Sequence, residues 1–144
     1  VTVLDDYAHH PTAVKATVAA IRGHYPGRKL WALFEAESNT SRRRIFHAPY
    51  VEAFGSTGAD RVIFCSPLRK EGDPLSEEQL LDVAALCEEI SAQGVPAQFV
   101  AQVPDIVTLV AGQAEPGDVI LAMSGRNFRG LHADLLTALT DRFC

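Results

Sequence analysis

Two carboxylates, a phenol and two imidazoles lie close together near the start of the chain, at Asp5, Asp6, Tyr7, His9 and His10. A carboxylate that directly follows an apolar run can accept hydrogen bonds from ribose hydroxyls, or it can cap the next helix. Adjacent imidazoles point in different directions, so a metal ion shared by both is disfavoured, although a metal site that includes Asp5 or Asp6 stays open. For one of the two histidines, a capping or core position is the favoured interpretation.

The elements on either side of this cluster predict where it lies. Residues 1–4 are mostly apolar and indicate a strand. Val14, Val18 and Ile21 recur at helical spacing, and Pro11 suits the first turn of a helix over residues 12–22. The cluster is therefore predicted to form a strand-to-helix loop. In an open α/β sheet, ligands bind beyond the carboxyl ends of strands, and a helix N-terminus attracts anions.

The rest of the chain repeats this alternation. Uninterrupted apolar runs such as residues 30–34 are expected for strands of a parallel sheet that is covered on both faces. We expect strands at residues 1–4, 30–34, 61–65, 97–100 and 119–123, and helices at residues 12–22, 45–54, 76–93, 104–114 and from 131 onward. The sequence thus predicts an α/β fold, a three-layer sandwich around a mainly parallel, Rossmann-like sheet of about five or six strands, with right-handed crossovers.

Local sequence signals favour one of these helices and argue against another. Ser76 and Gln79 form a capping-box pattern ahead of an apolar stripe, which predicts that a helix begins at Ser76. Gly94 is expected to end that helix in a left-handed conformation. In the stretch 45–54, Pro49 argues against a regular helix.

Three polar loops follow the first, second and fifth predicted strands, at residues 5–12, 35–44 and 124–130. Parallel strands end at the same edge of a sheet, so these loops are expected to converge on one site. The run 42–44 is all arginine. At a helix start the dipole disfavours cations, which suggests a nearby anion, and a solvated loop is the alternative. Residues 124–127 combine flexible backbone with hydrogen-bond donors.

Composition bounds the function. A chain of 144 residues fits one domain, and a net charge of −5 argues against nucleic acid as the main partner. Three widely spaced cysteines indicate reduced thiols in a cytosolic protein, and neither a membrane span nor a signal peptide is expected. The start at Val1, within a predicted strand, suggests a domain of a longer protein. No P-loop or GxGxxG pattern occurs.

Residues 5–12 closely resemble the motif that opens the C-terminal domain of the Mur ligases, which form amide bonds with ATP during peptidoglycan synthesis. Ser38-Asn39-Thr40, and Met123-Ser124 followed by Phe128 and Gly130, resemble the murein peptide ligase branch of that family. The resemblance covers nearly the whole chain. It implies that residues 1–144 form the C-terminal domain of a cytoplasmic three-domain enzyme of peptidoglycan recycling.

The resemblance also implies a reaction and its partners. The full-length enzyme would join a murein tripeptide to UDP-N-acetylmuramate through an acyl phosphate, using ATP and Mg²⁺. The phosphate loop, the magnesium ligands and the catalytic residues would lie in a central domain and the UDP site in an N-terminal one. The domain in hand would then contain no catalytic or metal-binding residue and would be inactive alone.

Residue by residue, the resemblance assigns two groups. Asp6, Tyr7, His9 and His10 would bind ATP. The peptide would contact the second and fifth loops, through Ser38, Asn39, Thr40, Arg42, Arg43, Ser124, Gly125, Arg126 and Asn127. The chain departs from the family pattern at Glu37, where Arg is usual, at 125–127, where Asn-Gly-Gly is usual, and at Arg129, where Gly is common. We expect Arg126, with one arginine of the run 42–44, to bind peptide carboxylates, and Glu37 to face the peptide amine or an arginine of the site.

Three other functions stay open at this point. The nearest is a UDP-N-acetylmuramate–L-alanine ligase domain of the same family. A non-catalytic nucleotide-binding α/β module and a metal-dependent hydrolase built on the first cluster are the others.

Overall fold

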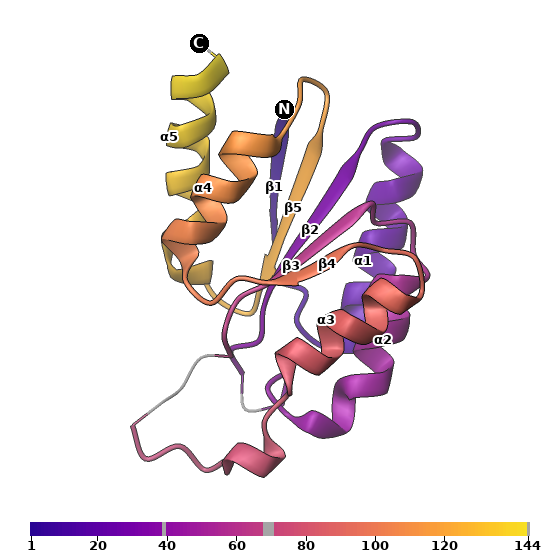
Figure 1. The fold of residues 1–144 in the computed structure, drawn as a ribbon, viewed down its shortest axis with the longest axis vertical. Helices are drawn as coiled ribbons and strands as arrows, with labels where there is room; N and C mark the ends of the chain where they lie inside the picture. Colours follow the sequence, from indigo (N-terminus) through magenta and orange to yellow (C-terminus); the bar gives the residue numbers. More distant parts are fainter. Residues whose placement is uncertain (39, 68–70, 144) are drawn as a thin grey trace.

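The protein, analysed as a computed structural model, is described over residues 1–38, 40–67 and 71–143. Its sheet consists of β1 (Thr2–Asp6), β2 (Leu30–Glu35), β3 (Arg61–Phe64), β4 (Ala97–Phe99) and β5 (Val119–Ser124). The five strands lie in the order β1-β5-β2-β3-β4, and all neighbouring pairs are parallel (Figure 1). The predicted α/β class and parallel sheet are confirmed.

The helices divide between the two faces of the sheet. α1 (Pro11–His24), α2 (His47–Gly55) and α3 (Val83–Ala92) cover one face, while α4 (Val103–Gln113) and α5 (Leu131–Phe143) cover the other (Figure 1). From β1 to β4 the chain moves in one direction across the sheet, with its helices on one face. It then moves back through α4 to β5 on the other face, so that every crossover is right-handed. The helices after β1 and β2 therefore leave toward one face and the helix after β5 toward the other. Such a division opens a crevice at the carboxyl ends of these strands.

The core consists of two apolar layers because the strands are buried on both sides. In β2 every residue is buried, with Leu30, Ala32 and Phe34 facing α1, α2 and α3 while Trp31 and Leu33 face α4 and α5. This alternation follows from the two-residue repeat of a strand. An apolar run without polar alternation thus signals a central strand here, as expected.

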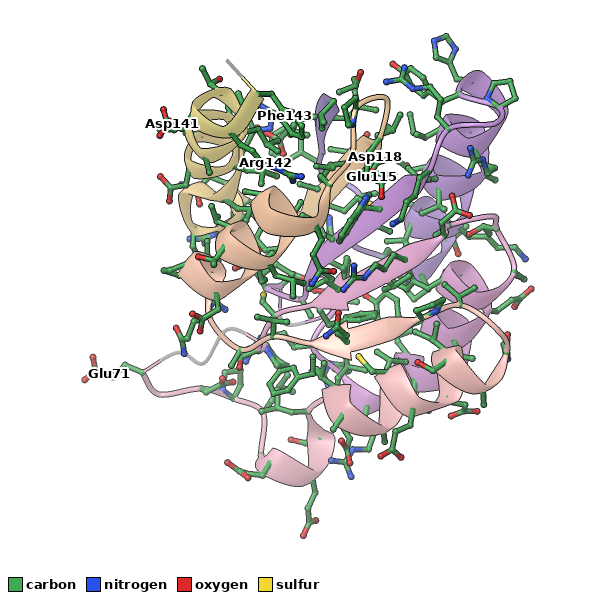
Figure 2. The ribbon with its side chains drawn as sticks, turned by 45° about the horizontal axis from the view of Figure 1, so that its top comes forward. Glu71, Glu115, Asp118, Asp141, Arg142 and Phe143 are labelled. Carbon is green, nitrogen blue, oxygen red and sulfur yellow. The ribbon has the colours of Figure 1, made fainter. Side chains whose placement is uncertain are left out.

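Polar contacts close the amino end of the sheet and the adjoining helices. Trp31 Nε1 donates to the buried Asp118 carboxylate at 2.9 Å, and the Glu115 N–H donates to the same oxygen at 3.0 Å. Arg142, on α5, donates to the carbonyls of Ala111 and Ala114 at the end of α4 (Figure 2). These bonds lie opposite the edge at which the three polar loops leave the sheet.

The boundaries of the first strand differ from the expectation. Asp5 and Asp6 belong to β1, opposite Ala122 and Met123 of β5, rather than to the loop. β1 therefore ends two residues and β5 one residue further than the apolar pattern indicates, because their backbones continue to pair up to Asp6 and Ser124. The loop after β1 is correspondingly shorter and holds Asp6 at its rigid end.

The predicted helix start at Ser76 is wrong. Gln79 Oε1 does accept from the Ser76 N–H at 2.9 Å, but only a short 3-10 turn, Glu77–Gln79, follows. The chain then extends at Leu80, which pairs with Arg43, and α3 begins at Val83 after its N-cap Asp82. Pairing with a distant segment has overridden the local capping signal, as tertiary contacts often do.

Two other local predictions have clear outcomes. Gly94, with φ of +100°, adopts the left-handed conformation expected at the end of α3. Pro49 is the third residue of α2, where a backbone N–H would have no helical partner, so the helix tolerates it. Residues 47–55 therefore form a helix although they contain a proline.

Candidate functional site

The three polar loops meet because their strands are neighbours. β5 lies between β1 and β2, and the register places Met123 beside both Asp6 and Phe34, with Ser124 beside Glu35. The loops after these strands therefore leave the sheet side by side, above the crevice between oppositely directed helices. We define the site as the ends of β1, β5 and β2 together with these three loops.

The β1 loop holds Asp6 in a fixed position. The Ala8 N–H donates to Asp6 Oδ1 at 2.8 Å, whereas Oδ2 accepts no hydrogen bond from the described residues. The adjacent Tyr7 side chain projects outward, and the residue is 75% exposed. Asp6 thus keeps one carboxylate oxygen for a ligand beside an accessible aromatic ring.

The two histidines of this loop have different roles. His10 is the N-cap of α1, and its Nδ1 accepts from the Thr12 N–H at 3.4 Å, which confirms a capping role for one histidine. His9 Nδ1 lies 2.7 Å from the Tyr7 carbonyl. The Tyr50 hydroxyl donates to the His9 carbonyl, and burial raises the pKa of Tyr50 above its ordinary value, so it remains a donor. His9 is therefore anchored at its backbone and its ring.

The β2 loop is folded back on itself and largely buried. The Ser38 N–H donates to Ser41 Oγ at 3.1 Å, and the Ser41 N–H donates to Ser38 Oγ at 2.9 Å. Thr40 is exposed, and Asn39 lies outside the described residues. The hydroxyl of Ser38 is thus already used within the loop, although the serine is only partly buried.

The arginines at 42–44 do not behave alike. Arg42 is fully buried and forms a double contact with the Asp73 carboxylate, with its second hydrogen bond at 3.1 Å. Arg44 donates from Nε to the Leu80 carbonyl at 2.9 Å. Arg43 is partly exposed, and its guanidinium forms no hydrogen bond or ion pair with the described residues. A solvated loop is therefore wrong for Arg42, whose nearby anion belongs to the protein itself.

The β5 loop is joined to the end of β2 by a buried hydrogen bond. Ser124 Oγ donates to Glu35 Oε1 at 2.7 Å and accepts from the Arg126 N–H at 3.1 Å. Further along, Asn127 Oδ1 accepts from the Arg129 N–H at 3.1 Å. These bonds shape the loop from within and leave the Arg126 and Asn127 side chains at its exposed surface.

Arg129 fixes the same loop from outside. Its Nε lies 2.8 Å from Glu35 Oε2, and its terminal nitrogen donates to the Ser66 carbonyl at 2.8 Å. Phe128 and Arg129 both have φ of +52°, a conformation that costs a non-glycine residue free energy. The buried Phe128 ring and the two Arg129 contacts hold this strained turn in place.

All three loops come together at Glu37. Its carboxylate is buried, with the Arg126 Nε 3.1 Å from Oε2. A Cβ placed on Gly125 would lie 3.2 Å from Glu37 Oε1 and 3.4 Å from the His9 ring. Glu37 facing an arginine of the site is one of the two arrangements that the sequence suggests.

Glu35, Ser66 and Asp73 are contributors that sequence reasoning missed. Glu35 had one usable signal, since it directly follows a fully apolar strand and so must lie at the strand end. Ser66 and Asp73 lie far from their arginine partners in sequence, and no spacing rule links them.

Comparison with known proteins now decides the family. Residues 1–126 match the family described as Mur ligase, glutamate ligase domain. The chain belongs to the Mur ligase family. Over 143 residues, 99% of this chain, it is 36% identical to the Escherichia coli UDP-N-acetylmuramate–L-alanyl-γ-D-glutamyl-meso-2,6-diaminoheptandioate ligase. It spans 28% of the length of that relative.

Solved structures of Mur ligases agree. A domain from a Haemophilus ducreyi protein titled as the corresponding ligase has a TM-score of 0.70 at 29% identity, covering 95% of this chain and 89% of that one. A murein peptide ligase from Psychrobacter arcticus has a TM-score of 0.71 at 30% identity, covering 95% of this chain and 27% of that one. The C-terminal domain fold expected from the first motif is confirmed.

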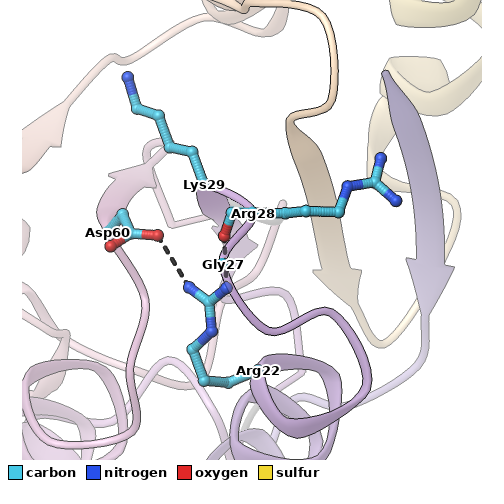
Figure 3. A pocket seen from close by; sticks show the side chains of 5 residues that line it. All are labelled: Arg22, Gly27, Arg28, Lys29 and Asp60. Atoms are coloured by element: carbon cyan, nitrogen blue, oxygen red, sulfur yellow. Dashed lines mark hydrogen bonds and ion pairs between the residues drawn. The ribbon is translucent and has the colours of Figure 1, made fainter.

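A hollow lies at the opposite end of this Mur ligase domain. It measures about 510 Å³ and is lined by Arg22, Gly27, Arg28, Lys29 and Asp60. Arg22 donates to Asp60 and to the Arg28 carbonyl, whereas the Arg28 and Lys29 side chains point away from each other (Figure 3). Its cations do not converge on one point, so it is a poor candidate for a ligand site.

Among the residues that the structure describes, no three His, Cys, Asp or Glu side chains gather as metal ligands would. Within that part of the chain, no helix combines the length and apolar character that a membrane span requires.

Proposed function

We propose that this chain is the C-terminal domain of a longer, ATP- and Mg²⁺-dependent ligase that joins a murein peptide to UDP-N-acetylmuramate through an acyl phosphate. The observation that carries the proposal is the 36% identity to the Escherichia coli ligase across nearly the whole chain. Relatives named as UDP-N-acetylmuramate–L-alanine ligases match at 29–33% identity, which favours the peptide-adding reaction over the alanine-adding one.

The β1 loop is the part that would contact ATP. Asp6 Oδ2 is open to ribose hydroxyls while Oδ1 is held by the Ala8 N–H. The exposed Tyr7 ring and the anchored His9 ring both follow that carboxylate within three residues, and His10 caps the helix after them. These residues fit a nucleoside. When bound, ATP would supply the phosphoryl group that activates the sugar carboxylate. The residues that catalyse this transfer would belong to another domain.

The β2 and β5 loops are the parts that would contact the peptide. Thr40, Arg43, Arg126 and Asn127 offer side chains that are at least partly exposed. Ser38, Ser124 and Gly125 shape the backbone between them. A contact from Arg42 would have to compete with its ion pair to Asp73. Arg43 and Arg126 are therefore the cations that we assign to peptide carboxylates.

The test uses the full-length protein that contains this domain. Release of ADP should require both UDP-N-acetylmuramate and L-alanyl-γ-D-glutamyl-meso-diaminopimelate, and mass spectrometry should find the joined product. The isolated domain should fold but release no ADP. Ligation of L-alanine in preference to the tripeptide would favour the other branch, and ADP release without any acceptor would contradict the proposal.

A further inference from the structure

We propose that Glu37 and Arg126 together recognise a zwitterionic end of the acceptor, with its ammonium group on Glu37 and its carboxylate on Arg126. The inference rests on the proposed function, because the acceptor is the peptide of that reaction. It concerns the end of the peptide distant from the reacting amine. The assignment follows from a comparison of two ion pairs between the end of β2 and the β5 loop, Glu37–Arg126 and Glu35–Arg129.

The Glu37 carboxylate is buried without being satisfied. The residue is 6% exposed, and no described residue donates an aligned hydrogen bond to Oε2. Arg126 Nε approaches that oxygen to 3.1 Å, but its N–H does not point at it. Burying a carboxylate without hydrogen bonds is unfavourable, so a donor from outside the domain would stabilise it.

The Arg126 side chain is free to change partners. It is 71% exposed, and an ion pair with one partner in solvent contributes little stability. Arg129 differs, because its side chain is 29% exposed and it also donates to the Ser66 carbonyl. One of the two pairs therefore fastens the β5 loop to β2, while the other can open for a ligand.

Gly125 leaves room next to the Glu37 carboxylate. Its φ is not in the left-handed region, so its backbone conformation does not require glycine. A Cβ at this position would lie 3.2 Å from Glu37 Oε1 and 3.4 Å from His9 Nδ1, closer than most Cβ contacts. The absence of a side chain keeps the space between these two groups accessible to a ligand atom.

The chemistry of the pair matches an amino-acid end group. A primary ammonium group has three N–H donors for the Glu37 carboxylate, whose Oε2 receives no aligned hydrogen bond from the residues that the structure describes. A guanidinium binds a carboxylate through two parallel hydrogen bonds. In a ligand with both groups on one carbon, the ammonium would take the place of Arg126 beside Glu37. The carboxylate would take the place of Glu37 beside Arg126.

The experiment compares three tripeptide acceptors in the full-length enzyme. They differ only at the distant end, which contains an ammonium and a carboxylate, the carboxylate alone, or the ammonium alone. In the unmodified enzyme, loss of the ammonium should raise the acceptor KM by about tenfold or more, the size expected for a hydrogen bond between charged groups. In Glu37→Gln that difference should vanish, and in Arg126→Ala the carboxylate should no longer matter.

Glu88→Gln is the matched control, since Glu88 is an exposed acid on α3 away from the three loops, and it should leave all three KM values unchanged. The comparison of acceptors in the unmodified enzyme needs no variant, so it decides the matter even if Glu37→Gln does not fold. Equal KM values with and without the ammonium would overturn the inference while leaving the ligase intact. Absence of ligation with every acceptor would instead remove the proposed function and the inference with it.

Discussion

The two ends of the sheet both contain buried acids, but they treat them differently. At the amino end, Asp118 accepts from Trp31 Nε1 and from the Glu115 N–H, both at good distances. Asp60, an exposed acid at the same end, accepts from the Leu30 N–H and from Arg22, each at 2.8 Å. The buried Asp118 thus receives aligned donors from neighbouring elements and joins them, as buried polar groups in a stable scaffold generally do.

At the carboxyl end the acids are left partly unsatisfied. Glu35 Oε2 and Glu37 Oε2 each lie near an arginine, at 2.8 and 3.1 Å, without an aligned hydrogen bond. Such groups cost stability unless a ligand completes them. The contrast supports the proposal that ligands bind at the carboxyl end while the amino end serves stability, and the predictions below test that division.

The largest expected effect is from Arg42→Ala. Arg42 lies at the carboxyl end, but both of its terminal nitrogens donate to the buried Asp73 carboxylate, so it should behave as a structural residue. Removing it takes the arginine partner away from a buried carboxylate, and the free energy of unfolding should fall by about 3–5 kcal/mol in urea titrations. Arg43→Ala is the control, with a change within about 0.5 kcal/mol. Similar losses of stability in both variants would show that the buried Arg42–Asp73 ion pair does not stabilise the fold more than an exposed arginine does.

Asp6 should separate ligand binding from folding. Asp6→Ala in the full-length enzyme should weaken ATP binding by about 1.5–3 kcal/mol, which is measured as a higher KM for ATP. Asp6→Asn keeps an Oδ1 acceptor for the Ala8 N–H, so its melting temperature should match the unmodified enzyme while ATP binding still weakens. If Asp6 merely supports the loop, Asp6→Ala will lower the melting temperature and leave the ATP dependence unchanged.

Asp118→Ala tests the amino end. It removes the acceptor of the buried Trp31 indole, and the free energy of unfolding should fall by about 1–3 kcal/mol. Because this end has no assigned ligand, KM values of the full-length enzyme should not change at a temperature where the variant is folded. A selective rise in one KM would mean that the amino end also serves function.

The smallest effect concerns pH. Burial is the main cause that raises the pKa of both Cys65 and Cys87 to about 12 in the folded protein. Unfolded thiols titrate near pH 8.5, so above that pH the unfolded chain binds fewer protons than the folded one and stability falls as pH rises toward 12.

Between pH 7.5 and 9.5 the loss should be about 1.4 kcal/mol per thiol, measured by urea titration at each pH. The double variant Cys65→Ala, Cys87→Ala should remove this part of the pH dependence. An unchanged slope in that variant would show that other groups cause it. The same thiols should resist alkylation until the domain unfolds.

Local sequence determined the elements, because strand and helix periodicities reflect which side chains are apolar over a few residues. The uninterrupted run at residues 30–34 marked a central strand, and Gly94 marked the end of α3. The motif at residues 5–12 was specific enough to indicate the family that the comparisons then established. These features depend on neighbours in the chain, so they can be inferred without the fold.

Only the tertiary structure decided which distant residues meet. The position of β5 between β1 and β2 places Gly125 and Arg126 against Glu37, far away in sequence. Pairing of Arg43 with Leu80 delayed the start of the helix predicted from Ser76 to Val83, and Asp73 proved to be the anion beside the buried Arg42. Strand order and long-range ion pairs depend on the packing of whole layers, and no short-range periodicity encodes them.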